Sequence, residues 1–167
     1  DAPVSGGVKK AHAGTLTVLG AGDSQKFKEL NPLLSAFAKE IFYVGPLGAG
    51  KTLKAINQML IAINTLGVIE GITLARKHKV DMNIFSQVIQ HSSGNSYAFE
   101  NYVNKIVNED FASGFKLALM TKDLETTLAI KKETSLPLLE AAYSRFKEGE
   151  EYKELDFSSI SKRYSVE

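Results

Sequence analysis

Hydrophobic and polar positions follow one pattern before residue 45 and another after it. Before that point, β-rich runs at 15–19 and 41–44 are separated by a helix-like stretch at 24–39, which a glycine turn at 20–23 precedes. Short apolar runs that alternate with a helical pattern are typical of an α/β unit. Such strands need a larger sheet to bury both faces.

After residue 48 the pattern predicts helices and no further strand. The first predicted helix, residues 48–78, is apolar on nearly every side, which is typical of a helix at the centre of a bundle. Further helices are predicted at 84–90, 97–107, 116–134 and 138–147, followed by a short amphipathic segment from Asp156. The sequence therefore predicts a mainly α fold, with an all-α part at 46–167 and a remnant α/β segment at 1–45.

Composition narrows the function classes. The net charge is +1 and no long Lys/Arg run occurs, which disfavours nucleic acid as a partner. The chain has no cysteine and only three scattered histidines, so metal catalysis is not expected. No uncharged run approaches the length of a membrane helix and no cleavable signal is visible, so we expect no membrane partner and a cytoplasmic location. The chain opens on Asp1-Ala2-Pro3-Val4 without a methionine, so we expect a piece of a longer protein.

The stretch GPLGAGKT at Gly45–Thr52 satisfies the phosphate-binding pattern GxxxxGK[ST], in which backbone amides cradle phosphates. A P-loop also needs later strands of a parallel sheet, one of them ending in an acidic residue for Mg²⁺. Nothing after Thr52 supplies them, so a nucleoside-triphosphate site is the weaker interpretation. The glycines can instead form a tight linker, with Lys51 and Lys54 as solvated residues in the first helical turns.

A third interpretation of this stretch involves Lys54, Asn57 and Gln58, which share one side of the predicted helix because they lie three and four positions apart. The helix dipole disfavours a lysine cation near a helix N-terminus, and burial against Leu53 and Ile56 would disfavour it further. These properties suit a lysine that acts as a general acid or base toward a carbonyl or alcohol oxygen, with the neighbouring amides binding substrate.

Four segments together resemble the β-hydroxyacid dehydrogenase family, which includes 3-hydroxyisobutyrate and tartronate semialdehyde dehydrogenases. They are DAPVSGG at 1–7, GTLTVLGAG at 14–22, GPLGAGKTLKAINQ at 45–58 and MTKDL at 120–124, and they stand in the family's order. The resemblance implies a Rossmann-type NAD(P)-binding domain, of which residues 1–45 are the terminal α/β portion. It also implies that residues 46–167 form the all-α substrate and oligomerisation domain.

The resemblance assigns roles to particular residues. It implies that Ser5, Gly6 and Gly7 bind the substrate carboxylate; without it, an ordinary Ser-Gly-Gly turn would be the better interpretation. It implies that Lys54 is the catalytic lysine, with the conserved amide at Asn57 or Gln58, and that Lys51 stands at a variable position.

The resemblance implies an active-site cleft between the two domains. It places Lys122 near the nicotinamide side of this cleft, with Asp123 orienting it or capping the helix. From the residues alone, the two could equally form a solvated pair.

The implied activity is hydride transfer between NAD or NADP and a small β-hydroxyacid or its semialdehyde. The glycine-rich fingerprint GxGxxG is absent from the chain, so we expect it to bind dinucleotide poorly and to be inactive alone. We also expect a homo-oligomer, a dimer or tetramer. Two alternatives stay open: a non-catalytic dimerisation or scaffold module of the same fold, and the less favoured P-loop nucleotide binder.

Overall fold

The computed structural model describes residues 1–112 and 114–164. Its contacts divide the chain into two compact units, Asp1–Asn57 and Gln58–Glu167. The dividing point lies inside the longest helix, α3 (Ala49–Lys77). The domain boundary expected at 45/46 remains a prediction.

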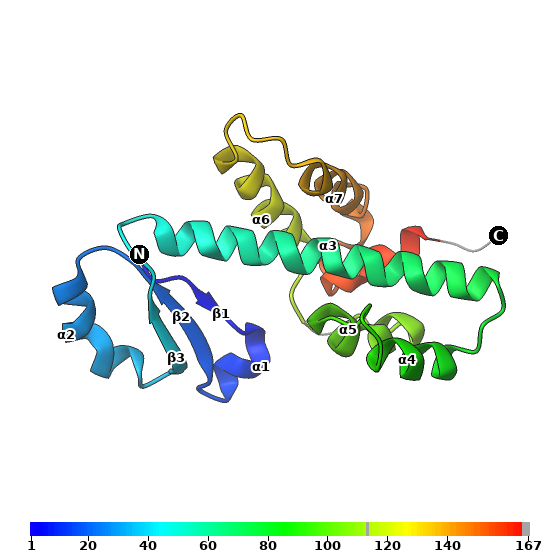
Figure 1. Ribbon diagram of the computed structural model, residues 1–167, viewed down its shortest axis with the longest axis horizontal. Coiled ribbons are helices and arrows are strands. Elements are labelled where there is room, and N and C mark those ends of the chain that lie inside the picture. The colour runs from blue at the N-terminus through cyan, green and yellow to red at the C-terminus, as the bar shows by residue number, and fades with distance from the viewer. Residues whose placement is uncertain (113, 165–167) are drawn as a thin grey trace. The chain divides into compact units, whose positions relative to one another are not determined.

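The first unit contains a small mixed sheet in the order β1-β2-β3. Its elements are β1 (Val4–Ser5), α1 (Gly7–His12), β2 (Leu16–Gly20), α2 (Ser24–Leu34) and β3 (Ala38–Tyr43), followed by the first turns of α3. Strand β1 runs antiparallel to β2, and β2 runs parallel to β3. Helix α2 connects the two parallel strands, as a crossover between parallel strands requires (Figure 1).

Helix α2 ends earlier than the sequence predicts. The helix-like stretch was expected to continue to residue 39, but α2 ends at Leu34 and β3 begins at Ala38. Pro32 lies inside the last turn, where it has no amide hydrogen to donate. The pairing of Ala38 with Leu16 in the sheet then overrides the helical preference of the following residues. Helix α1, directly after the expected turn at Ser5–Gly7, was not predicted.

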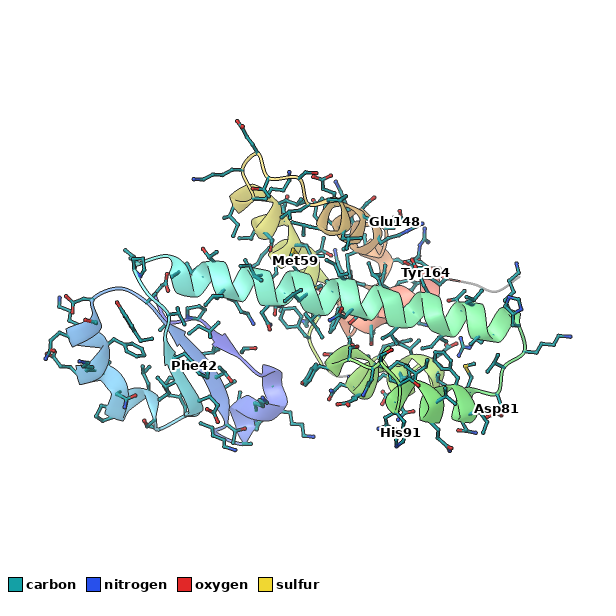
Figure 2. All side chains as sticks on the ribbon, viewed as in Figure 1. Phe42, Met59, Asp81, His91, Glu148 and Tyr164 are labelled. Atoms are coloured by element: carbon teal, nitrogen blue, oxygen red, sulfur yellow. The ribbon has the colours of Figure 1, made fainter. Side chains whose placement is uncertain are left out.

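The sheet of the first unit buries few of its own apolar side chains. Val18 is fully buried and Ala38 is 6% exposed, whereas Phe42 is 50% and Tyr43 45% exposed. Figure 2 labels Phe42 on β3. This agrees with the expectation that such strands need a larger sheet.

The second unit is helical and has a closed core. Besides the remainder of α3 it contains α4 (Met82–Gln90), α5 (Tyr97–Val107), α6 (Leu117–Ile130) and α7 (Pro137–Lys147), with 3₁₀ turns η1 (Glu150–Tyr152) and η2 (Phe157–Arg163). Its largest fully buried side chains include Phe146, Phe157, Ile69, Leu117 and Met120. The predicted fold class, mainly α with a remnant α/β segment, is confirmed.

The helix ends of this unit are fixed by identifiable hydrogen bonds. The Asp81 carboxylate caps α4, and the Ser96 hydroxyl caps α5 through the Phe99 amide at 3.1 Å (Figure 2 labels Asp81). Helix α6 has no side-chain cap. The Leu117 and Ala118 amides instead donate to carbonyls late in the chain, those of Leu155 (2.9 Å) and Lys153 (3.0 Å).

Helix α6 was expected to extend to Thr134, but it ends at Ile130. Lys132, two residues further on, has a φ of 53°, a left-handed conformation that an α-helix does not accommodate.

The expectation that α3 is buried on nearly every side is wrong. The buried side chains form one stripe that includes Ala62, Leu66, Ile69 and Ile72. Leu53, Ile56, Leu60 and Leu74 are 41%, 39%, 51% and 60% exposed. By length and composition α3 could also cross a membrane, with 39% of its most apolar window buried, but core helices of soluble proteins pass the same test.

Candidate active site

The predicted carboxylate loop, Ser5–Gly7, lies where β1 ends and α1 begins. Ser5 pairs with Thr17 across the antiparallel ladder, which fixes the start of the loop. Gly6 and Gly7 have φ angles of 133° and 64°, a region that other residues rarely adopt. A side chain at Gly6 would also collide with Lys10, at 2.7 Å. The backbone of this turn therefore requires glycine at position 6 and favours it at position 7.

The glycines of GPLGAGKT have backbone roles as well. Gly45 and Gly48 have φ angles of 123° and 98°, and together they turn the chain from β3 into α3. The Thr52 hydroxyl donates to the Gly48 carbonyl at 3.0 Å within the helix. All strands of the described residues precede this stretch, so the described chain has none of the later strands that a P-loop requires.

Asp1 ties the chain's first residues to the start of α3. Its Oδ2 accepts a hydrogen bond from the Gly48 amide at 2.7 Å. Its main-chain nitrogen donates to the Ala21 carbonyl (3.0 Å), and the Ala21 amide donates to the Asp1 carbonyl (2.8 Å). Sequence reasoning assigned no role to Asp1. An acidic residue at the head of DAPVSGG was its only signal, and its partner lies 47 positions away.

Lys54 and Asn57 lie in the first turns of α3, in the same unit as the Ser5–Gly7 loop. The Lys54 side chain is half-buried and Asn57 is exposed, and each makes interactions within the protein. Lys51, the lysine of the P-loop pattern, is exposed.

The other predicted site residues, Gln58, Lys122 and Asp123, belong to the second unit. Gln58 is 5% exposed, and its side-chain amide donates to the Asp123 carboxylate at 2.9 Å. This bond connects α3 to α6. Lys122 is exposed on α6. Asp123 was expected to orient Lys122 or cap the helix; its carboxylate accepts the bond from Gln58, and the expected role remains a prediction.

A cavity lies elsewhere in the second unit. It has a volume of about 550 Å³ and is lined by residues such as Ile72, Arg76, Ile106, Lys162 and Tyr164, none of which is a predicted site residue.

Two family models match the chain. The model described as "NAD binding domain of 6-phosphogluconate dehydrogenase" matches residues 1–45. The model described as "NAD-binding of NADP-dependent 3-hydroxyisobutyrate dehydrogenase" matches residues 48–164. An α/β piece joined to a helical unit in this order defines the class of two-domain nicotinamide-dependent dehydrogenases. Because the second match covers most of the chain, the chain belongs to the β-hydroxyacid dehydrogenase family.

Individual relatives agree with this assignment. The chain is 40% identical to 2-(hydroxymethyl)glutarate dehydrogenase of Eubacterium barkeri over 83% of its own length and 46% of the relative's. It is 36% identical to 3-hydroxyisobutyrate dehydrogenase of Pseudomonas aeruginosa over 98% and 59% of the two chains. The solved structure of Mycobacterium tuberculosis 3-hydroxyisobutyrate dehydrogenase with L-serine superposes with a TM-score of 0.93 at 31% identity, covering 99% of this chain and 60% of that one.

The chain thus spans about half to three fifths of the length of these relatives. The resemblance stated from the sequence is confirmed at the level of family, and the family's cofactor is NAD or NADP. The roles of the individual site residues remain predictions.

Proposed function

We propose that this chain forms the substrate-binding, C-terminal part of an enzyme that transfers a hydride between NAD(P) and a small β-hydroxyacid or its semialdehyde. The observation that carries the proposal is a half-buried lysine, Lys54, in the first turns of a helix whose unit also contains the glycine-rich Ser5–Gly7 turn. Relatives of the chain are named for 2-(hydroxymethyl)glutarate, 3-hydroxyisobutyrate, L-serine and L-threonate.

The residues of this chain would share the work as follows. The Ser5 hydroxyl and the amides of Gly6 and Gly7 bind the substrate carboxylate, because the hydroxyl and backbone amides of a turn can donate hydrogen bonds to an anion. Lys54 takes the hydroxyl proton as the carbonyl forms and returns it in the reverse direction. Removing a positioned acid or base costs about 10² to 10⁴ in turnover.

The amides of Asn57 and Gln58 are the candidates for binding the substrate's polar groups. The hydrogen bond from Gln58 to Asp123 indicates that Gln58 also helps to hold α3 to α6, whereas Asn57 is exposed.

The chain has candidate residues for the nicotinamide end of the cofactor but no motif for its pyrophosphate. No GxGxxG segment occurs in the chain, so the pyrophosphate would be bound outside it. Lys122, exposed on α6, and Asp123 are the candidates for the nicotinamide side. When bound, the nicotinamide accepts or supplies the hydride.

Self-association and location belong to the same proposal. Helix α4 is amphipathic yet buries none of its residues fully, and Ile84 and Val88, one turn apart, are each 55% exposed. Exposed apolar side chains at this spacing favour a protein partner, which we propose is a second copy of the chain. Light scattering at tens of micromolar should show at least a dimer, and a monodisperse monomer would refute this part. We propose a cytoplasmic location, which the absence of cysteine permits.

The test of the catalytic proposal compares two lysines three positions apart. In the dehydrogenase that contains this chain, Lys54→Ala should lower kcat by about 10² to 10⁴ and leave dinucleotide affinity nearly unchanged. Lys51→Ala, at an exposed position, should be close to neutral. Equal and mild effects of the two substitutions would favour the scaffold alternative. ATP binding abolished by Lys51→Ala would favour the P-loop alternative.

A further inference from the structure

We propose that Asp1 is a positioning residue, whose carboxylate fixes the start of α3 against the end of β2 and thereby sets where Lys54 stands. The inference rests on the catalytic role proposed for Lys54. It adds a residue to which the sequence motifs assign no role.

Two sets of contacts make Asp1 a connection between sheet and helix. Its backbone exchanges two hydrogen bonds with Ala21, just beyond the end of β2, at 3.0 and 2.8 Å. Its side chain reaches α3, where Oδ2 accepts from the Gly48 amide at 2.7 Å. The first amides of a helix have no partner within the helix, and a carboxylate is the favoured acceptor at this positive end. Figure 1 shows the N-terminus beside the start of α3.

Because Gly50 has no side chain, the start of α3 can lie close to Asp1 and to the end of β2. A Cβ at Gly50 would lie 2.3 Å from Asp1 Oδ1 and 2.3 Å from the Leu19 carbonyl oxygen. Neither atom can move aside easily, because one is backbone and the other belongs to a carboxylate held through its second oxygen. Asp1 Oδ1 is buried and has no hydrogen-bond partner among the described residues. The space beside Asp1 Oδ1 is therefore available only because residue 50 has no side chain.

The contact matters for Lys54 because of helix geometry. Residues i and i+4 lie one above the other on the same side of an α-helix. Lys54 is four positions after Gly50, so it projects from the side of α3 that is pressed against Asp1 and Leu19. A rotation or shift of the first turn of α3 would move the lysine together with that contact. A misplacement of about 1 Å in a reacting group can cost about 10²-fold in rate.

The test uses the dehydrogenase that contains this chain, four single variants at Asp1 and Asp23, and Lys54→Ala with and without Asp1→Ala. Asp1→Ala removes the acceptor, and Asp1→Asn keeps an acceptor oxygen for the Gly48 amide. The matched control is Asp23, which caps α2 in the same unit through the Lys26 amide at 2.9 Å. Helix α2 contains no predicted site residue. The controls are Asp23→Ala and Asp23→Asn.

We expect Asp1→Ala to lower kcat by about 10- to 100-fold, with the KM for the hydroxyacid and the Kd for dinucleotide changed by less than about threefold. Asp1→Asn should restore most of kcat. The Tm should fall no further in the Asp1 variants than in the Asp23 variants. In the Lys54→Ala background, Asp1→Ala should cause no additional loss of kcat, because the two residues act through one group.

The inference would be overturned if Asp1→Ala had the same kcat as Asp23→Ala, or if Tm and kcat fell in parallel in both Asp1 variants. It would also be overturned if Asp1→Ala lowered kcat as much in the Lys54→Ala background as in the unsubstituted enzyme. If Lys54→Ala itself proved silent, the proposed function would fail instead, and the two failures are therefore distinguishable.

Discussion

The two units each hold a chain segment in place with an aspartate, Asp156 in the helical unit and Asp1 in the α/β unit, but the two carboxylates are satisfied to different degrees. One Asp156 oxygen accepts from Lys105 Nζ (3.3 Å) and the Phe115 amide (3.2 Å), and the other accepts from the Ser158 amide (3.1 Å) and hydroxyl (2.5 Å). Among the described residues, the Asp1 carboxylate has one donor, the Gly48 amide at 2.7 Å. A carboxylate with donors on both oxygens fixes a fold, whereas one with a single donor contributes less stability and can still fix the orientation of what it touches.

The surroundings of Asp156 support this distinction. Its side chain is 1% exposed, and a Cβ at Gly114 would overlap its Oδ2. Burial, followed by the charge of Asp156, raises the pKa of the neighbouring Tyr102 well above its usual range. Lys105 lies over the Tyr102 ring at 5.9 Å. The ion pair of Lys105 with Asp156, the Tyr102 ring and the loop at Gly114 therefore depend on one another in the helical unit.

The largest effect is expected from Asp156→Ala. It removes a buried acceptor shared by Lys105, two amides and the Ser158 hydroxyl, which should lower the free energy of unfolding by about 3–5 kcal/mol. Urea unfolding followed by circular dichroism in the helix band measures it. The control, Glu154→Ala, removes an exposed ion pair with Lys116, and its unfolding midpoint should be unchanged. Similar midpoints for both variants would remove the basis of the comparison.

Gly114→Ala should have the next largest effect. Its φ is 142° and its Cβ would overlap the Asp156 carboxylate, so we expect a loss of about 1–3 kcal/mol in the same measurement. Gly67 on α3 is the matched control, since its Cβ would meet nothing within 4 Å. Gly67→Ala should stabilise the helix by about 0.5–1 kcal/mol. A Gly114→Ala variant as stable as Gly67→Ala would show that the loop adapts freely.

The smallest effect on stability is expected from Asp1→Ala. Only one hydrogen bond to a helix start is lost, which costs about 1 kcal/mol. Urea unfolding should place this variant close to Asp23→Ala, which loses one amide bond of the same kind. A loss as large as that of Asp156→Ala would show that Asp1 stabilises the fold as much as Asp156 does, which would contradict the comparison.

Local patterns predicted much of the fold. Helix α5 was predicted at 97–107 and observed at Tyr97–Val107, because Ser96 provides a local cap and the apolar spacing is regular. The end of α2 was missed because strand pairing decided it. The exposure of Leu60 and Leu74 on α3 was missed because composition tells that a helix is apolar and does not tell which of its sides other elements cover.

The candidate site divides in the same way. Ser5–Gly7 and Lys54 could be proposed from the sequence because their signals are short motifs, and their roles remain predictions. The contacts that hold such residues, from Gly48 to Asp1 and from Gln58 to Asp123, join positions 47 and 65 residues apart. Contacts of this kind follow from how the chain closes on itself, which no local pattern contains.

The capping of α6 also affects the order of folding. Its first amides are satisfied by the carbonyls of Lys153 and Leu155, which are synthesised long after Leu117. At roughly 5–20 residues per second, a ribosome adds those acceptors seconds after Leu117. Until residues 153–155 have docked, the start of α6 relies on water for its amides, and the helix has not reached its final stability. A released chain truncated before Lys153 should therefore expose α6 to proteases, whereas a chain that includes residues 153–155 should protect it.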